Sequence, residues 1–245
     1  TGANLGIDFT GGTSITVSNK NITKTELEEF IKKKYNIEKI NNNNEEINII
    51  LKEVLEKDDI TQIKNQLQDE LNLESDIYVV SSVVKKELVK NAIKSLILAS
   101  IGIVIYVAIR FKFNYAISGI IALIHDVLFT FLFFSVFKIE IDSVFIAAIL
   151  TIIGYSINDT IVTFDIIREN YKTKYKNNIT KEKDLDELVN ISIRRTLYRT
   201  ILTTITTIIP VIILMIFGSS EILNFNISLL VGFIAGVYSS IFISN

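Results

Sequence analysis

The chain has 245 residues, 49% of them hydrophobic, and a formal net charge of −2 at pH 7. Its mean hydropathy is +0.41, and its charged residues are concentrated in residues 20–94 and 168–199. This uneven distribution indicates a membrane protein with a polar domain. The absence of cysteine and the single histidine exclude disulfides and any cysteine-based or histidine-rich metal site, and we expect no metal and no cofactor.

Residues 1–88 are predicted to form a ferredoxin-like α+β domain. Ile15 and Val17 alternate with polar residues, as in a strand over 12–18. Thr23 and Glu26 have the spacing of a capping box, which predicts a helix over 23–35. The remaining predicted elements are strands over 37–40 and 47–54 that form a hairpin, a helix over 58–71 and a strand over 76–84. This β-α-β-β-α-β order is typical of the split ferredoxin-like pattern.

Residues 89–245 are predicted to form a transmembrane helical bundle. Each apolar segment is near the ~20 residues that a helix needs to cross a bilayer. The five predicted spans are 92–109, 115–137, 143–165, 199–217 and 226–243.

The distribution of basic residues predicts the orientation of the spans. Basic residues follow the first span and crowd the predicted loop 166–198, whereas the other two connections contain only Lys138 among three acids. Because basic loops stay in the cytoplasm, we expect a multi-pass protein of the cytoplasmic (inner) membrane with residues 1–88 on its periplasmic or outer face. The basic segment could also bind anionic lipid or a partner, although fixing the topology is its more common role. The chain begins at Thr1 without Met or a signal peptide, and we expect truncation at both ends.

Asp159 is an ionisable side chain inside a segment that is otherwise apolar enough to span a bilayer. An aspartate at the centre of a membrane helix costs roughly 2.5–3.5 kcal/mol, so it normally faces a protein interior, pairs with another group or carries protons. Tyr155 and Thr163 lie one helical turn away on the same face, and Asn158 is adjacent. Arg199, at the start of the next span, could reach Asp159 from a neighbouring helix. We therefore predict a proton-handling site at Asp159.

His125 and Asp126 form a second polar pair within a span. As neighbours they could act as a proton relay. The structural alternative is that His125 bonds to a nearby backbone group and Asp126 packs against serine or threonine. Further along, Gly232 and Gly236 have the small-xxx-small spacing of a helix-packing face, or of an ordinary close helix contact.

A glycine-rich segment lies near the start of the chain, with Gly6, Asp8, Gly11 and Gly12 as its distinctive residues. It lacks the lysine of a phosphate-binding loop, and the predicted orientation puts it on the wrong side of the membrane for nucleotide. We expect Gly11 and Gly12 to form a tight turn into the first strand.

Three motifs resemble the SecF family of bacterial protein-export membrane subunits, a branch of the resistance-nodulation-division superfamily. They are Leu5-Gly6-Ile7-Asp8-Phe9-Thr10-Gly11-Gly12-Thr13, Gly154-Tyr155-Ser156-Ile157-Asn158-Asp159-Thr160 and Arg168-Glu169-Asn170. The resemblance extends to His125-Asp126 and to Thr196-Leu197-Tyr198-Arg199-Thr200, and it covers essentially the whole chain.

The resemblance implies an accessory subunit of the Sec translocase that works with SecD and the SecYEG channel. Such a subunit uses the proton-motive force to promote translocation of preproteins across the membrane. In this family Asp159 would be the proton-pathway carboxylate and Arg199 its partner, and a first membrane span would precede Thr1. SecD would supply a further carboxylate that this chain lacks.

Two other functions stay open. One is a proton-driven exporter of small molecules or lipids from the same superfamily. The other is a non-transducing scaffold of the translocon, in which Asp159 only holds helices together. We expect no enzymatic activity, because no nucleophile, base and orienting group cluster in the sequence, and we expect no nucleic-acid partner.

Overall fold

The computed structural model describes residues 2–18, 22–42, 46–111, 113–175 and 182–244. The chain divides into two compact units. One comprises Leu5–Asn91, and the other comprises Ala92–Asn245 together with the few residues before Leu5.

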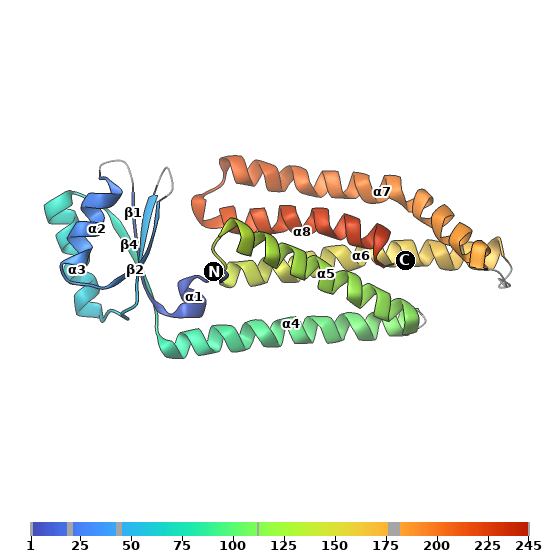
Figure 1. Cartoon of the computed structure of the whole chain (residues 1–245), viewed down its shortest axis with the longest axis horizontal. Helices are drawn as coiled ribbons and strands as arrows, with labels where there is room; N and C mark the ends of the chain where they lie inside the picture. Colours follow the sequence, from blue (N-terminus) through green and yellow to red (C-terminus); the bar gives the residue numbers. More distant parts are fainter. Residues whose placement is uncertain (1, 19–21, 43–45, 112, 176–181, 245) are drawn as a thin grey trace. The chain divides into compact units, whose positions relative to one another are not determined.

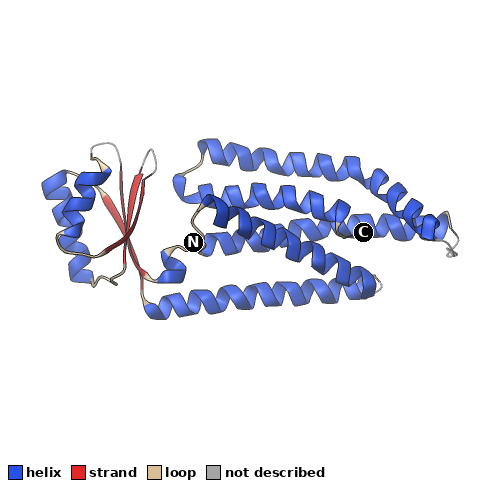
Figure 2. Ribbon diagram, in the orientation of Figure 1, coloured by secondary structure: helices blue, strands red, loops and turns tan. Residues whose placement is uncertain are grey.

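The unit Leu5–Asn91 is the α+β domain, and its strand order β2-β3-β1-β4 is antiparallel throughout. This topology confirms the predicted β-α-β-β-α-β fold, with a short additional helix in front. The elements, drawn in Figures 1 and 2, are α1 (Ile7–Thr10), β1 (Gly12–Ser18), α2 (Lys24–Lys32), β2 (Ile37–Asn42), β3 (Glu46–Leu51), α3 (Lys57–Leu71) and β4 (Ser75–Val80). The tip of the β2–β3 hairpin lies outside the described residues.

Both helices α2 and α3 cover the same face of this sheet (Figure 1). Ile15 of β1 and Ile49 of β3 are opposite each other and fully buried. They pack with Leu27 of α2 and with Ile63 and Leu67 of α3 in one apolar core. The alternation of apolar residues that predicted β1 is therefore the pattern that places every second side chain in this core.

The predicted capping box is present at the start of α2. The backbone N–H of Glu26 donates to the Thr23 hydroxyl, and the Glu26 carboxylate accepts from the Thr23 backbone. The hydrogen bonds from the Thr23 side chain and backbone lower the pKa of Glu26. At the other end of the domain the prediction of a strand over 76–84 is wrong at its end, because β4 stops at Val80 and a long helix begins at Ser82.

Gly11 and Gly12 form the predicted turn into β1. Their φ angles are +77° and +124°, a region that residues with a Cβ rarely adopt. A Cβ on Gly12 would also lie closer than 3.0 Å to the backbone carbonyl oxygen of Leu51, on the neighbouring strand β3. Both the backbone conformation and the close approach of β3 therefore require glycine at this position.

We expect Gly12→Ala to loosen the β1–β3 pairing. A strained φ alone costs about 1–3 kcal/mol, so amide hydrogen exchange in β1 should become roughly 5- to 150-fold faster in the full chain. Mass spectrometry of exchanged peptides measures this rate. Gly2→Ala is the control, because a Cβ on Gly2 would meet no atom within 4 Å. Equal exchange in the two variants would contradict the role of Gly12.

The second unit contains the membrane-spanning helices. Five helices are long and apolar enough to cross a bilayer within the described residues. They are α4 (Ser82–Arg110), α5 (Phe113–Phe137), α6 (Ser143–Thr173), α7 (Glu182–Phe217) and α8 (Leu223–Phe242), with the short 3-10 helix η1 (Ser220–Ile222) before α8. A helical bundle with five spans and an α+β domain is the predicted fold class.

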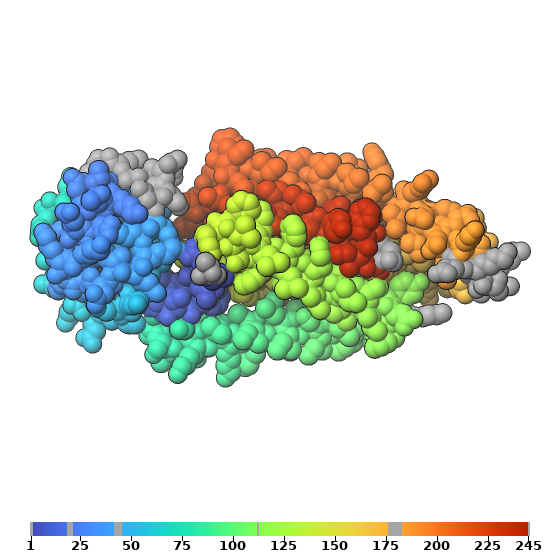
Figure 3. Space-filling view, viewed as in Figure 1, coloured from blue at the N-terminus to red at the C-terminus, as the bar shows by residue number. Residues whose placement is uncertain are grey.

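Helices α6 and α8 lie at the centre of the bundle. In the most apolar 18-residue segment of each helix, 50% of the residues of α6 and 56% of those of α8 are buried, compared with 6% for α4 and 17% for α7. On the face seen in Figure 3, side chains of α4, α5, α7 and α8 cover most of the bundle surface and little of α6 is visible. Several polar side chains of α6, Ser156, Asp159, Thr160 and Thr163 among them, are therefore buried, whereas Thr151 and Asn158 lie on its exposed face.

The prediction of a loop over 166–198 is wrong for most of its length. Helix α6 continues to Thr173, and α7 starts at Glu182. The two extensions are joined by a buried hydrogen bond from the Asn170 amide to the Ser192 hydroxyl, and by an ion pair between Arg195 and Glu169. Among the charged residues that suggested a loop, Arg168, Lys172, Lys183, Arg194 and Arg195 instead lie on these two helices, whereas Lys176 and Lys181 lie outside the described residues.

Candidate functional site

A polar seam runs between α6 and α7. Asp159 and Thr163 of α6 are buried, with 5% and 4% of their surface exposed. The Tyr155 hydroxyl donates to the Thr204 hydroxyl of α7 over 3.2 Å. Thr200, one turn before Thr204, is also buried. The spacing of four residues places these side chains on one face of each helix, and the seam is where the two faces meet.

Asp159 is the least satisfied polar group in this seam. Its Oδ2 atom is buried and has no hydrogen-bond partner in the described part of the chain. Thr163 donates to the backbone carbonyl of Asp159, over 3.2 Å, and leaves the carboxyl group free. Arg199 of α7 attracts the carboxylate electrostatically, but the two side chains form no direct ion pair. A buried carboxyl oxygen without a partner in this chain can accept a proton or a donor from another chain.

Asp126 of α5 is buried in a different environment. It has no exposed surface, and its Oδ2 accepts hydrogen bonds from the Ser156 hydroxyl at 2.5 Å and from the Ser239 hydroxyl at 2.8 Å. Its Oδ1 lies 3.1 Å from Nδ1 of His125. The cluster therefore joins α5, α6 and α8 through one carboxylate. Such satisfied buried networks hold helices in a single arrangement.

The two buried aspartates thus have different chemical capacities. Asp126 has partners on both oxygens, so taking up a proton there would disturb at least one existing hydrogen bond. Asp159 has a vacant oxygen beside a polar seam and a nearby positive charge. Of the two, Asp159 is the group at which protonation requires the smaller rearrangement.

The other residues predicted for the proton path are placed unevenly. Asn158 and Arg199 are exposed in this chain, Tyr155 is half-buried and Thr163 is buried. Ser156 lies three residues before Asp159, but its hydroxyl donates to Asp126 and not to a group of the seam. No group of three or more His, Asp or Glu side chains suited to a metal ion occurs among the described residues.

The glycine-rich segment belongs to the α+β domain and is separate from this seam. Gly6 is the N-cap of α1, and Asp8 is buried in that helix. Partial burial raises the pKa of the Tyr78 hydroxyl, and the charge of Asp8 with its hydrogen bond to that hydroxyl raises it further. Asp8 thus links α1 to β4 within the domain.

Sequence reasoning did not identify Ser239 as a partner of Asp126. A signal was available, because Gly232, Gly236 and Ser239 are small residues at helical spacing and lie on the face of α8 that contacts α6. A Cβ on Gly232 would come closer than 3.0 Å to Ile152 of α6, and one on Gly236 would lie 3.3 Å from Cβ of Ser156. The missing side chains allow α8 to approach closely enough for Ser239 to reach Asp126.

Taken together, the fold is that of a multi-pass helical membrane protein with an α+β domain and buried carboxylates in its bundle. Residues 59–245 match the family model described as "Protein export membrane protein SecD/SecF, C-terminal", and residues 1–18 match "SecD/SecF GG Motif". The chain belongs to the SecD/SecF family of protein-export membrane proteins.

Its relatives include both separate and combined subunits. The chain is 42% identical to protein translocase subunit SecF of Sebaldella termitidis, over all of this chain and 80% of that protein. It is 43% identical to protein translocase subunit SecDF of Bacillus subtilis, over 98% of this chain but only 33% of that protein. The chain therefore spans about four fifths of one relative and one third of the other.

Solved structures show the same fold. The crystal structure of SecDF, a translocon-associated membrane protein, from Thermus thermophilus superposes with a TM-score of 0.87 at 32% identity, over 99% of this chain and 33% of that one. A heavy metal efflux pump superposes with a TM-score of 0.50 at 17% identity, over 96% of this chain and 29% of the pump. The second likeness concerns the fold alone.

Proposed function

We propose that this chain is the SecF part of an accessory complex of the Sec translocase, and that it couples proton movement at Asp159 to preprotein translocation. The observation that carries this proposal is the vacant, buried Oδ2 of Asp159 in a member of a protein-export family. A charge that moves through 100 mV releases about 2.3 kcal/mol, which is enough to bias an equilibrium between two conformations.

The proposal includes SecD as a partner. Asn158 and Arg199 flank the seam but are exposed in this chain, so a neighbouring chain is needed to enclose a proton path there. The combined SecDF relatives supply a precedent for such a neighbour within one polypeptide. We further propose that the complex works with the SecYEG channel and acts on preproteins.

The proposed orientation follows from the charges at the helix ends. The end of α4, the start of α5, the end of α6 and the start of α7 lie at the same end of the bundle, and most basic residues of this unit lie in these helix ends or in the segments that join them. That end is assigned to the cytoplasm, which places the α+β domain on the periplasmic or outer face of the cytoplasmic membrane.

The direct test uses inverted membrane vesicles with and without the full-length subunit and its SecD partner. Preprotein translocation is measured by protease protection, in the presence and absence of a proton gradient. We expect the gradient to increase translocation more in vesicles that contain the complex. The proposal would be wrong if the complex stimulates translocation equally with and without the gradient.

That contrary result would favour the scaffold function, which has one observation in its support. Asp126 shows that a buried carboxylate in this bundle can serve to join helices, because its Oδ2 accepts hydrogen bonds from Ser156 of α6 and Ser239 of α8. The small-molecule exporter has no comparable support, because the likeness to the efflux pump concerns the fold alone.

A further inference from the structure

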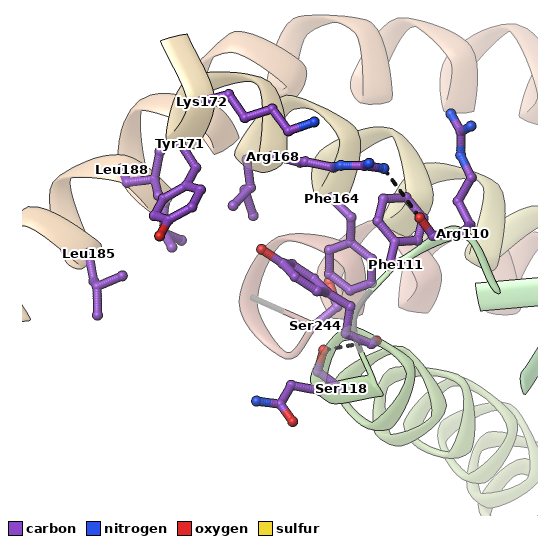
Figure 4. A pocket seen from close by; sticks show the side chains of 14 residues that line it. Arg110, Phe111, Ser118, Phe164, Arg168, Tyr171, Lys172, Leu185, Leu188 and Ser244 are labelled. Atoms are coloured by element: carbon purple, nitrogen blue, oxygen red, sulfur yellow. Dashed lines mark hydrogen bonds between the residues drawn. The ribbon is translucent and has the colours of Figure 1, made fainter. Parts of the chain in front are cut away.

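A pocket of about 830 Å³ lies at the basic end of the helical unit (Figure 4). It is formed by the end of α4, the start of α5, the end of α6 and the start of α7, and Ser244 also lines it. None of the residues of the Asp159 seam or of the Asp126 cluster lines it. The pocket is therefore a separate feature of the bundle, and proton coupling does not account for it.

Its walls are apolar and partly aromatic. Phe164 of α6 packs edge-on against Phe111 and Tyr115, with ring centroids 5.7 and 4.8 Å apart. Tyr171 of α6 and Leu185 and Val189 of α7 add apolar surface that stays accessible, since Leu185 is 49% exposed and the other two are half-buried. A small soluble anion has no apolar surface to bury against such a wall, whereas burial of an acyl chain against it is favourable.

Its rim is basic. Arg110, Arg168 and Lys172 line the pocket, and no acidic residue is among the residues that line it. Arg110 is paired with Asp165, and Arg168 donates to the backbone carbonyl of Arg110 over 3.2 Å. Neither Arg168 nor Lys172 forms an ion pair with an acid in the described ranges. Both side chains extend from α6 on the same side of the pocket (Figure 4).

We propose that this pocket binds one anionic phospholipid. The phosphate lies between Arg168 and Lys172, and one acyl chain lies along Tyr171, Leu185 and Val189, the apolar lining residues that keep accessible surface. The position suits this ligand, because these cations lie just past the apolar part of α6, where headgroups meet a membrane helix. The basic rim complements the phosphate of a phospholipid, and the apolar wall complements its acyl chain.

The test uses the full-length subunit with its SecD partner in phosphatidylcholine nanodiscs that contain a photoactivatable phosphatidylglycerol. Cross-linked peptides are mapped by mass spectrometry. We expect labelling of the α6 and α7 segments that line the pocket. Unlabelled phosphatidylglycerol should compete for this labelling, whereas extra phosphatidylcholine and soluble glycerol 3-phosphate should not.

The variant Arg168→Gln/Lys172→Gln should reduce this labelling about tenfold or more, because each basic residue near the surface strengthens binding of an anionic lipid. The matched control is Lys174→Gln/Arg195→Gln, which removes the same charge from exposed residues that do not line the pocket and should leave labelling unchanged. A third variant, Asn114→Trp, fills the pocket from an exposed position without changing its charge, and it should also reduce labelling.

Four results would overturn the proposal. Equal losses in the two double variants would mean that general surface charge attracts the lipid. Competition by glycerol 3-phosphate would mean a site for soluble anions. Labelling that stays away from the pocket, or a pocket filled by another segment of the full-length protein, would exclude phospholipid as the occupant.

Discussion

Replacing Asp159 with asparagine is expected to abolish the gradient-dependent part of preprotein translocation and to leave assembly with SecD intact. Asparagine has nearly the same size and can still accept a hydrogen bond, but it cannot take up and release a proton. Translocation driven without the gradient should continue. In the vesicle assay, the increment due to the gradient should fall to that of vesicles that lack the complex.

Asp165→Asn is the matched control, because it makes the same change two turns further along α6. Asp165 is partly exposed and pairs with Arg110, outside the seam. Asp126→Asn is a second comparison, since an amide oxygen can still accept from Ser156 or Ser239. We expect both variants to keep the gradient response. If Asp159→Asn responds to the gradient as the native protein does, Asp159 is structural and the scaffold function gains support.

Gly232→Ala is expected to separate α8 from α6. The new Cβ would come closer than 3.0 Å to three side-chain atoms of Ile152, including Cγ2 at 2.9 Å. Ile152 is fully buried and β-branched, so it has little freedom to move aside. Overpacking of this kind costs about 1–3 kcal/mol, and a shift of α8 would also pull Ser239 from Asp126. The thermal midpoint of the purified full-length protein in detergent should fall by several degrees.

Gly154→Ala is the matched control for this effect. Gly154 lies on the same helix as Ile152, and a Cβ there would meet no atom within 4 Å. Its substitution should leave the midpoint unchanged or raise it slightly, because alanine favours helix more than glycine does. The double variant Gly232→Ala/Ile152→Ala should recover part of the lost stability. A midpoint for Gly232→Ala equal to the native value would show that α8 has room to move.

Sequence patterns predicted much of this fold, and they failed at particular places. Alternation located β1 exactly, and the Thr23–Glu26 spacing located the start of α2, because both signals depend on neighbours in the chain. The strand predicted over 76–84 was too long, because the apolar residues Val83 and Val84 resemble a continuing strand but lie at the start of helix α4. The charged segment 166–198 looked like a loop, since pairing between α6 and α7 through Asn170 and Ser192 cannot be seen in either segment alone.

The sequence by itself determined the class of the protein, the buried carboxylates and the positions where glycine is needed. Those properties follow from the hydropathy of the residues and from their spacing along the chain, and both are the same whatever the fold. Only the tertiary structure decided that Asp126 is occupied by two serines from other helices, whereas Oδ2 of Asp159 is vacant. Hydrogen bonds between distant residues depend on how the helices pack. Gly232 and Gly236 set that packing by removing the side chains that would hold α8 away from α6.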